Sequence, residues 1–274
     1  MIGTGAEASF RAMTYDLKGK NVLVTGGSAG IGAALAVGFA ARGATVGICA
    51  RRTDRLEEVL ARCREHAPGS RSWTIDLSDL GALEGFAKRA ADELGGIDVL
   101  VNNAGIPKRR PVQALSTETV DELMRINYLS PVHLTLALLP GITERGGRIV
   151  FISSVAARLS PPAEAAYAAT KAAISAWAEC MKVDLRDTEV GIHVVYPGVI
   201  DTELFHLPGN DPLPQTGVEM LPVDAMVEPV LTAIETGRFE VSVPDWFDRV
   251  FESKYKDVAG FLDGTIAFVR SQPA

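Results

Sequence analysis

Short runs of apolar, mostly β-branched residues alternate along the chain with longer segments that repeat apolar residues at helical spacing. The short runs predict strands over residues 21–25, 45–49, 72–75, 99–101, 148–152, 193–196 and 240–243. The longer segments predict helices over residues 31–42, 55–65, 80–94, 120–139 and 163–185. Alternating strands and helices favour a parallel sheet covered on both faces. We therefore expect one doubly wound α/β domain with a seven-stranded sheet.

A glycine-rich segment, Thr25-Gly26-Gly27-Ser28-Ala29-Gly30-Ile31-Gly32, follows the first predicted strand. In doubly wound sheets the ligand lies outside the carboxyl ends of the strands, where this segment falls. Glycine permits a tight turn and close approach of a phosphate, and the next helix offers unpaired N–H groups to it. The pattern predicts dinucleotide binding, whereas the plainer alternative is a tight turn between strand and helix.

The second predicted strand is followed by Ala50-Arg51-Arg52. A site that prefers NAD usually places an acid here to bind the ribose 2′-hydroxyl, and Ala50 occupies that position. Arg51 can bind a 2′-phosphate through charge-assisted hydrogen bonds, and Ser28 could contact the same group. Arg52 either assists or points to solvent, and the plainer alternative is a solvated pair of arginines. The sequence thus predicts NADP(H) rather than NAD(H).

Tyr167 and Lys171 lie four positions apart in an Ala-rich segment, residues 163–178, that is expected to be helical. Positions i and i+4 share one face of a helix. An ammonium near a phenol lowers the phenol pKa, which would make Tyr167 a general acid/base. The alternative is a tyrosine at the edge of the core beside a solvated lysine.

Several motifs occur together in a fixed order. The chain resembles the classical short-chain dehydrogenase/reductase (SDR) family in its Thr-Gly-x-x-x-Gly-x-Gly turn, in Asn102-Asn103-Ala104-Gly105 and in Tyr167-x-x-x-Lys171. The resemblance extends to residue 202 and includes Asp76-Leu77, Asn127, Ser153-Ser154, Pro197-Gly198 and Thr202. It implies a Rossmann-type fold and an enzyme that uses a nicotinamide cofactor.

The resemblance implies a role for each of four catalytic residues. Tyr167 is the acid in reduction and the base in oxidation, and Lys171 lowers its pKa and binds the nicotinamide ribose. Ser154, thirteen positions before Tyr167, polarises the substrate carbonyl. Asn127 holds a water in a proton relay to Lys171, although a buried Asn could be purely structural. Ser153 is expected to face away and to pack.

The glycine turn, the second strand end and the resemblance together define a cofactor site. Its residues are Gly26, Ser28, Ala29, Gly30, Ile31, Gly32, Arg51, Arg52, Asp76, Leu77, Asn103, Ala104, Gly105, Tyr167, Lys171, Pro197, Gly198 and Thr202. By resemblance, Asp76 meets the adenine, residues 103–105 line the nicotinamide-side ribose, residues 197–198 pack on the ring, and Thr202 binds its carboxamide. The candidate substrate residues are Ser154, Val155, Tyr167, Leu204 and Phe205.

Composition excludes several other classes. A net charge of −7 argues against nucleic-acid binding. Cys49, Cys63 and Cys180 show neither zinc spacing nor a disulfide pattern, so we expect no metal and a reducing, cytoplasmic compartment. No apolar run reaches the length of a membrane span, and the N-terminal residues lack the pattern of a secretory signal. His133 and His193 are expected to be core or packing residues.

We expect residues 1–16 to be a loosely ordered extension, 17–245 the catalytic domain, and 246–274 a helical extension. Residues 203–221 are placed as a substrate lid, and their apolar content suggests a hydrophobic substrate. Residues 108–110, Lys-Arg-Arg, either form a solvated loop or meet an acidic thioester substrate. The C-terminal extension departs from the family pattern, in which this end of the chain contributes to a tetramer interface. We therefore expect at least a dimer, either a homodimer or a homotetramer.

The preferred hypothesis is an NADP(H)-dependent oxidoreductase that interconverts a secondary alcohol and a ketone. One alternative is a β-ketoacyl thioester reductase on the same scaffold. Another, of a different class, is a sensor or scaffold protein that binds NADPH without turnover.

Overall fold

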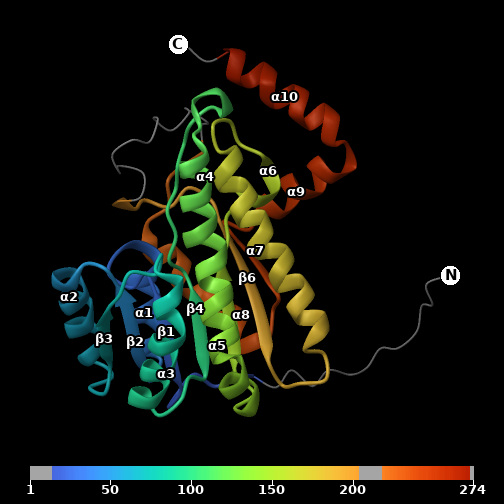
Figure 1. The fold of residues 1–274 in the computed structure, drawn as a ribbon. Coiled ribbons are helices and arrows are strands. Elements are labelled where there is room, and N and C mark those ends of the chain that lie inside the picture. The colour runs from blue at the N-terminus through green and yellow to red at the C-terminus, as the bar shows by residue number, and fades with distance from the viewer. Residues whose placement is uncertain (1–13, 204–217, 272–274) are drawn as a thin grey trace, which may run out of the picture.

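A single parallel sheet of seven strands forms the centre of the computed structural model, which describes residues 14–203 and 218–271 (Figure 1). The strands run in the order β3-β2-β1-β4-β5-β6-β7. Their bounds are β1 Asn21–Thr25, β2 Thr45–Ala50, β3 Arg71–Thr74, β4 Val99–Asn102, β5 Arg148–Ile152, β6 Gly191–Pro197 and β7 Glu240–Val243. The predicted doubly wound fold is confirmed, with strand ends shifted by at most two residues.

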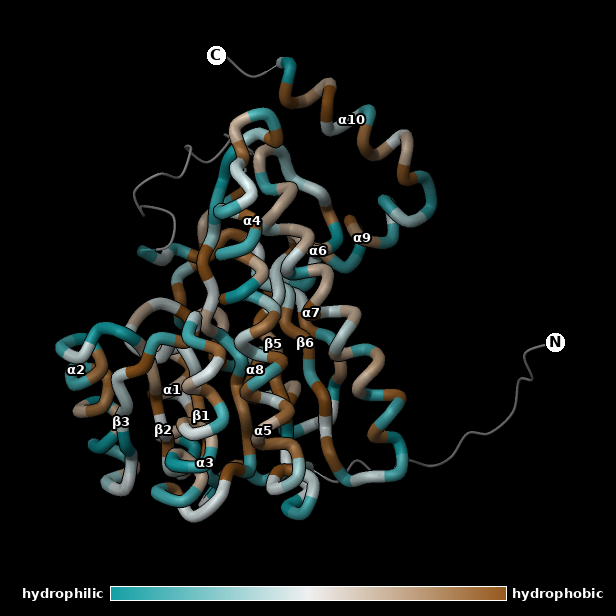
Figure 2. The backbone as a smooth tube through the Cα atoms, in the orientation of Figure 1, coloured by the Kyte–Doolittle hydropathy of each residue, from teal (hydrophilic) through white to brown (hydrophobic). Residues whose placement is uncertain are grey.

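Helices cover both faces of the sheet. The helices are α1 Gly30–Ala41, α2 Thr53–Arg64, α3 Leu83–Leu94, α4 Thr117–Met124, α5 Ser130–Glu144, α6 Ala156–Leu159, α7 Ala165–Asp184, α8 Val227–Thr236, α9 Phe247–Lys256 and α10 Val258–Ser271. One core cluster joins α1, α2 and α8 to the sheet, and the other joins α3, α5, α7 and α9 to its opposite face. The continuous apolar strands in Figure 2 lie between these two layers.

The segment predicted as one helix over residues 120–139 is divided. α4 and α5 are joined by a π-helical turn, Arg125–Leu129, in which the backbone bonds skip one residue further than in an α-helix. Asn127 lies inside this turn and is buried. Single π-helical turns are frequent at functional sites.

The helix that carries Tyr167 and Lys171 begins two residues later than predicted. α7 starts at Ala165, because Pro161 and Pro162 precede it and Ala163 adopts a left-handed φ of 60°. The carbonyl of Ala163 accepts a hydrogen bond from the N–H of Arg110 at 2.7 Å. The entry to α7 is therefore held by the loop that follows β4.

The segment before β1 and helix α9 both contact the body of the protein, whereas α10 does not pack on it. The N–H of Tyr15 donates to the carbonyl of Glu235 at 2.8 Å, and the Arg148 guanidinium lies 4.0 Å from the Tyr15 ring centroid. At the other end, Lys254 in α9 donates to the carbonyl of Arg158 and, at 2.8 Å, to the hydroxyl of Ser160. α10 projects away from the body (Figure 1) and buries none of its residues. The domain boundaries at residues 16 and 245 stay predictions.

Candidate active site

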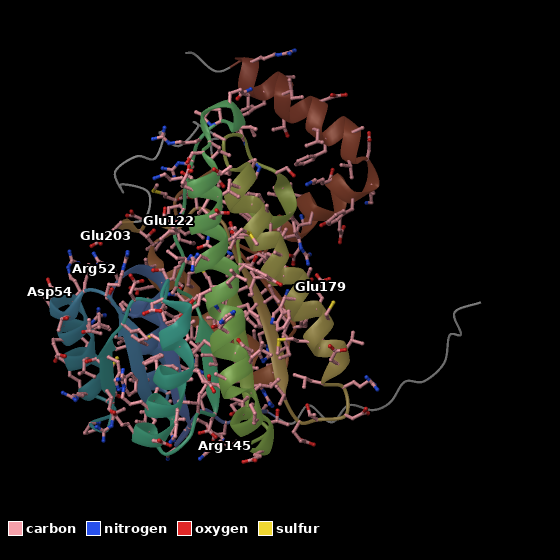
Figure 3. The ribbon with its side chains drawn as sticks, in the orientation of Figure 1. Arg52, Asp54, Glu122, Arg145, Glu179 and Glu203 are labelled. Atoms are coloured by element: carbon pink, nitrogen blue, oxygen red, sulfur yellow. The ribbon has the colours of Figure 1, made fainter. Side chains whose placement is uncertain are left out.

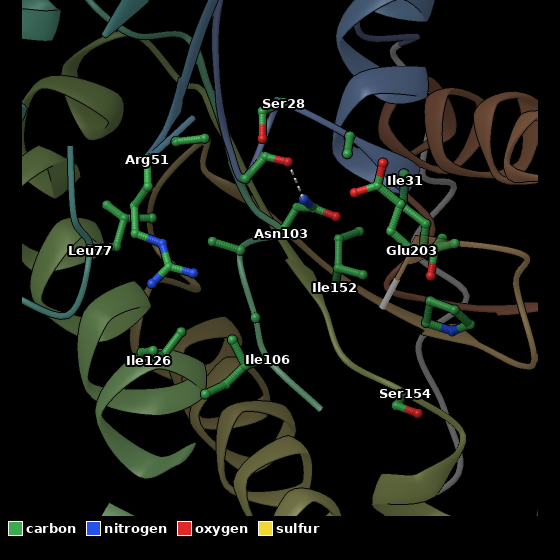
Figure 4. Close-up of a pocket in the computed structure, with 18 of the residues that line it drawn as sticks. Ser28, Ile31, Arg51, Leu77, Asn103, Ile106, Ile126, Ile152, Ser154 and Glu203 are labelled. Atoms are coloured by element: carbon green, nitrogen blue, oxygen red, sulfur yellow. Dashed lines mark hydrogen bonds between the residues drawn. The ribbon is translucent and has the colours of Figure 1, made fainter. Parts of the chain in front are cut away.

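A cavity of about 380 Å³ opens at the carboxyl ends of β1 and β4, where the strand order reverses direction (Figure 4). Most of the predicted site residues line it. They are Gly26, Ser28, Ala29, Gly30, Ile31, Arg51, Arg52, Asp76, Leu77, Asn103, Ala104, Gly105, Ser154, Tyr167, Lys171, Pro197, Gly198 and Thr202. Gly32, Asn127 and Val155 are not part of the lining. The fold thus brings segments far apart in sequence to one cavity of the size that binds cofactors.

The turn between β1 and α1 has the geometry of an anion cradle. Gly26 and Gly30 have φ values of +67° and +55°, which other residues rarely adopt. No side chain caps the N-terminus of α1, and its first turn carries no acidic residue. The free N–H groups and the helix dipole therefore favour a phosphate at this end of the cavity.

Gly32 sits behind this cradle. A Cβ at position 32 would lie 2.4 Å from both the Asn103 side-chain nitrogen and the Gly26 carbonyl oxygen. Gly32→Ala is therefore expected to displace the turn and to weaken dinucleotide binding by about tenfold or more, since one steric shift here disturbs several phosphate contacts. Titration of cofactor fluorescence measures the loss. Gly85→Ala, where a Cβ meets nothing within 4 Å, is the matched control and should bind normally.

A second set of hydrogen bonds fixes the strand ends beneath the cavity. The Thr25 hydroxyl accepts from the N–H groups of Asn103 and Ala104, each at 3.0 Å. The Asn103 side-chain nitrogen donates to the carbonyls of Thr25 at 2.8 Å and Gly26 at 3.4 Å. These hydrogen bonds fix the end of β1 to the loop after β4 beneath the cavity.

The end of the cavity beside β2 and β3 carries the charged residues expected at the adenosine. Asp76 accepts hydrogen bonds from the N–H of Ser78 at 2.9 Å and its hydroxyl at 2.8 Å. These bonds, with a smaller contribution from Arg51, hold the pKa of the Asp76 carboxyl below its usual value. Asp76 is therefore a charged acceptor that faces the cavity near Arg51.

Arg52 is exposed to solvent, as one of its two predicted alternatives held, but it is also ion-paired. Its guanidinium is 2.8 Å from the carboxylate of Glu203, and Figure 3 shows these two residues near each other. The same carboxylate also pairs with Arg55 at 2.9 Å. Both predicted alternatives for Arg52 therefore omitted its ion-pair partner. Among the described residues, Arg51 makes no ion pair, so it is the arginine that the cavity leaves available.

The catalytic candidates converge at the other end of the cavity. Tyr167 and Lys171 come from α7, and Ser154 lies just after β5. The Lys171 nitrogen lies 5.8 Å from the Tyr167 ring centroid and donates to the carbonyl of Ile152 at 2.8 Å. The Ser154 hydroxyl accepts from the N–H of Ala156 at 3.1 Å, which orients it.

The predicted lowering of the Tyr167 pKa is not found in this structure. Burial raises the pKa of the phenol, the Glu164 carboxylate raises it further, and a hydrogen bond with Ser154 lowers it in part. Burial also lowers the pKa of Lys171 to about 8. The phenol is therefore held protonated at neutral pH, which suits a proton donor.

Asn127 does not line the cavity but hydrogen-bonds the loop at Ile106, which does. Its side-chain nitrogen donates to the carbonyl of Ile106 at 3.0 Å and to the hydroxyl of Thr170 at 3.1 Å, while its oxygen accepts from the N–H of Ile106 at 2.9 Å. A Cβ at Gly105 would lie 3.2 Å from the Asn127 oxygen and 3.4 Å from the Lys171 nitrogen. The Asn127 oxygen and the Lys171 nitrogen therefore both lie against Gly105.

Three further predictions concern single polar residues. Ser153 makes the expected packing contacts, because its hydroxyl donates to the carbonyl of Lys171 at 3.0 Å and contacts the Ser175 hydroxyl at 2.8 Å, but it does not face away from the site, since it is part of the cavity lining. His193 is buried as expected, and burial lowers its pKa to about 4. The prediction for His133 is wrong, because it lies exposed on the outer face of α5.

The predicted solvated loop at residues 108–110 is also wrong. Arg109 is only 2% exposed, and its charge acts on the carboxyl of Glu164 at the start of α7. The residue therefore belongs to the interior beside the catalytic helix. Two candidate substrate residues, Leu204 and Phe205, lie outside the described residues.

Sequence reasoning missed several lining residues. Ala50, Ile75, Ser78, Ile106, Ile126, Ile152, Ser153, Ile200 and Glu203 also line the cavity. Most of them adjoin a motif residue, so the flanks of each motif could have indicated them. Glu203 directly follows the motif residue Thr202, but its ion pairs had no signal, because Arg52 and Arg55 lie about 150 positions earlier in the chain.

Neither a metal site nor a membrane span is found in residues 14–203 and 218–271. No group of three or more His, Cys, Asp or Glu side chains there could hold a metal ion. No helix of that part is long and apolar enough to cross a membrane.

Comparison with known proteins gives consistent relatives. The short chain dehydrogenase family model matches residues 20–211. The dehydrogenase/reductase SDR family member 7B of Rattus norvegicus is 38% identical over 204 residues, which are 71% of this chain and 62% of the relative. The chain thus spans about three-fifths of the length of that curated relative.

Solved structures share the fold. A short chain dehydrogenase from Burkholderia cenocepacia in complex with NADP is 29% identical with a TM-score of 0.73, covering 83% of this chain and 97% of its own. A short chain dehydrogenase/reductase from Burkholderia phymatum in complex with NAD has a TM-score of 0.79 at 21% identity, over 89% of this chain and 95% of its own. The fold, the cavity and these matches show that the chain belongs to the short-chain dehydrogenase/reductase family of NAD(P)-dependent oxidoreductases.

Proposed function

We propose that the protein is an NADP(H)-dependent oxidoreductase that interconverts a secondary alcohol and a ketone. One observation carries the proposal: Ser154, Tyr167 and Lys171 meet at one end of the cavity, and Arg51 lies at the other, where the last residue of β2 is Ala50 and not an acid. The first group is suited to proton transfer at a carbonyl, and the second to a phosphate ester.

The residues of this chain would divide the work on the substrate oxygen. When bound, the nicotinamide supplies the hydride. The Ser154 hydroxyl and the Tyr167 phenol would both hydrogen-bond the carbonyl oxygen, and Tyr167 would donate its proton as negative charge develops there. Lys171 would hold positive charge near the phenol, and Asn127 would keep the loop at Ile106 in place.

The cofactor preference rests on the two residues at the carboxyl end of β2. Ala50 offers no carboxylate to bind a 2′-hydroxyl or to repel a 2′-phosphate, and Arg51 reaches the cavity. The proposal of a hydrophobic substrate is supported by apolar side chains around the cavity, including Ile106, Ile126 and Ile152. Arg109 is buried, so no observation favours a thioester substrate that would meet it from solvent.

The direct test follows nicotinamide absorbance at 340 nm with NADPH and NADH against a panel of hydrophobic ketones and alcohols. Cofactor binding is measured separately by fluorescence. Turnover with a ketone supports the proposal. Tight NADPH binding without turnover across the whole panel would contradict it and favour a sensor that binds without catalysis.

The NADP(H) assignment predicts the behaviour of Arg51→Ala. Loss of one charge-assisted phosphate contact should raise KM for NADPH by about tenfold, because hydrogen bonds to charged groups contribute roughly 1.5–3 kcal/mol before solvent screening reduces the effect. KM for NADH should change far less. Initial rates with both cofactors measure the ratio, and equal changes would show that Arg51 does not meet the 2′-phosphate.

The proposal also includes a cytoplasmic location and a homodimer or homotetramer. The described cysteines are free thiols, as suits a reducing compartment. Leu136 on α5 and Val183 on α7 are 51% and 63% exposed, and such apolar surface is suited to a subunit contact. Light scattering gives the assembly size directly.

A further inference from the structure

One carboxylate joins two walls of the cavity at its outer edge. Glu203 lies after β6, whereas Arg52 and Arg55 belong to the start of α2 after β2. Its two oxygens take separate partners, Arg52 at 2.8 Å and Arg55 at 2.9 Å. Figure 3 shows Arg52 and Glu203 at the same corner of the molecule. This ion-pair cluster spans segments that are otherwise separate.

The ion-pair cluster lies next to the glycine turn between β1 and α1. Thr202, which precedes Glu203, packs at the turn, where a Cβ on Gly30 would lie 3.1 Å from its methyl group. Arg51, Arg52 and Glu203 all line the cavity. The cluster therefore lies where a phosphate ester at the end of β2 would arrive.

The ion pairs of Glu203 determine which arginines are available to such a phosphate. Arg51, Arg52 and Arg55 bring three positive charges to this corner, and Glu203 pairs with two of them. The Arg52 pairing holds the pKa of the Glu203 carboxyl below its usual value, so the carboxylate is charged at neutral pH. A phosphate that enters must compete with Glu203 for Arg52.

We propose that Glu203 is a cofactor-specificity residue that withholds Arg52 from the 2′-phosphate and so limits the preference for NADP(H). The inference rests on the proposed function, because it concerns the same adenosine end of the cavity. A cofactor without the 2′-phosphate does not compete for Arg52, so Glu203 leaves its affinity unchanged. Glu203 thus sets the ratio of the two affinities rather than either reaction rate.

The test compares dissociation constants of NADPH and NADH for the wild type and Glu203→Gln. The amide keeps the shape and removes the charge. NADPH should bind about fivefold more tightly at low ionic strength and NADH should change by less than about twofold, since the three side chains are 43–48% exposed and such pairs are modest. The gain should shrink in high salt.

Asp54→Asn is the matched control. Asp54 lies on the same first turn of α2 but makes no ion pair within the described part of the chain. It should not change the NADPH to NADH ratio as Glu203→Gln does. If both variants increased the NADPH affinity equally, the effect would come from removal of any nearby negative surface charge, and the inference would be overturned.

A double-variant cycle separates this inference from the cofactor assignment. Arg52→Ala should cost the Glu203→Gln protein more NADPH affinity than it costs the wild type. Equal costs, or weaker NADPH binding by Glu203→Gln, would overturn the role of Glu203. The two proposals can also fail separately. If the wild type shows no preference for NADP(H) but the Glu203→Gln variant does, the proposed cofactor is contradicted and this inference is supported.

Discussion

Replacing Tyr167 by phenylalanine should lower kcat by about a hundred- to ten-thousandfold, the range that a positioned general acid contributes. The substitution removes the phenolic proton and keeps the ring. Cofactor affinity should change little, because Lys171 retains its hydrogen bond to Ile152. The loss therefore appears in turnover and not in binding.

Steady-state rates and cofactor titration on the same preparation test this expectation. Tyr255→Phe is the control, because Tyr255 is 62% exposed on α9, away from the cavity lining, and its loss should leave turnover unchanged. Retained activity in Tyr167→Phe would show that another group protonates the substrate oxygen. The raised pKa of Tyr167 also predicts a pH dependence. Alcohol oxidation needs the phenolate as base, so its rate should increase as pH rises.

The second large effect is expected at Lys171, where catalysis and stability should move in opposite directions. Lys171→Met should abolish most activity and weaken cofactor binding, yet stabilise the protein without cofactor at pH 7. Burial lowers the Lys171 pKa from 10.5 to about 8, so keeping it charged in the fold costs about 3 kcal/mol. The variant also loses the hydrogen bond to the Ile152 carbonyl, which destabilises it by about 1 kcal/mol and offsets part of this gain.

The expected net gain is a rise in Tm of roughly 5 °C at pH 7. The gain should depend on pH in a defined way. Between pH 8 and 10.5 the unfolded chain holds more protons at this lysine than the folded one, so wild-type stability rises with pH. The methionine variant lacks this contribution, and its advantage should shrink over that window.

Thermal unfolding without cofactor at pH 7, 9 and 10.5 measures the difference between the two proteins. Lys88→Met is the control, because Lys88 is 77% exposed and pairs only with Asp92 among the described residues. A variant less stable than wild type at pH 7 would show that Lys171 is not a strained buried charge. Such a result would leave its catalytic role open to the activity measurement.

Features that depend on local sequence were predictable. The strand β1 is buried along nearly its whole length, so its apolar run showed both its position and its depth. The Tyr167–Lys171 spacing located one helix face, since side chains four apart meet on any α-helix. The glycine turn was readable because positive φ restricts Gly26 and Gly30 to that residue type.

Features that depend on distant partners were not predictable. Arg109 reads as a solvated charge in sequence, but the start of α7 places Glu164 beside it and buries it. The same Glu164 contributes to reversing the expected shift of the Tyr167 pKa, after burial. Glu203 reaches arginines about 150 positions earlier. The burial of Arg109, the direction of the Tyr167 pKa shift and the ion pairs of Glu203 all depend on how loops pack against distant segments. The periodicity of apolar residues carries no information on these contacts.

The contact between Gly198 and α9 has a consequence for how the chain can vary. A Cβ at Gly198 would lie 2.5 Å from the Phe247 ring, which is itself buried against the core. Helix α9 therefore restricts the residue type allowed at position 198, which lines the cavity. A larger residue at position 198 therefore requires a smaller side chain at position 247, so a change at Gly198 depends on a prior or simultaneous change in α9.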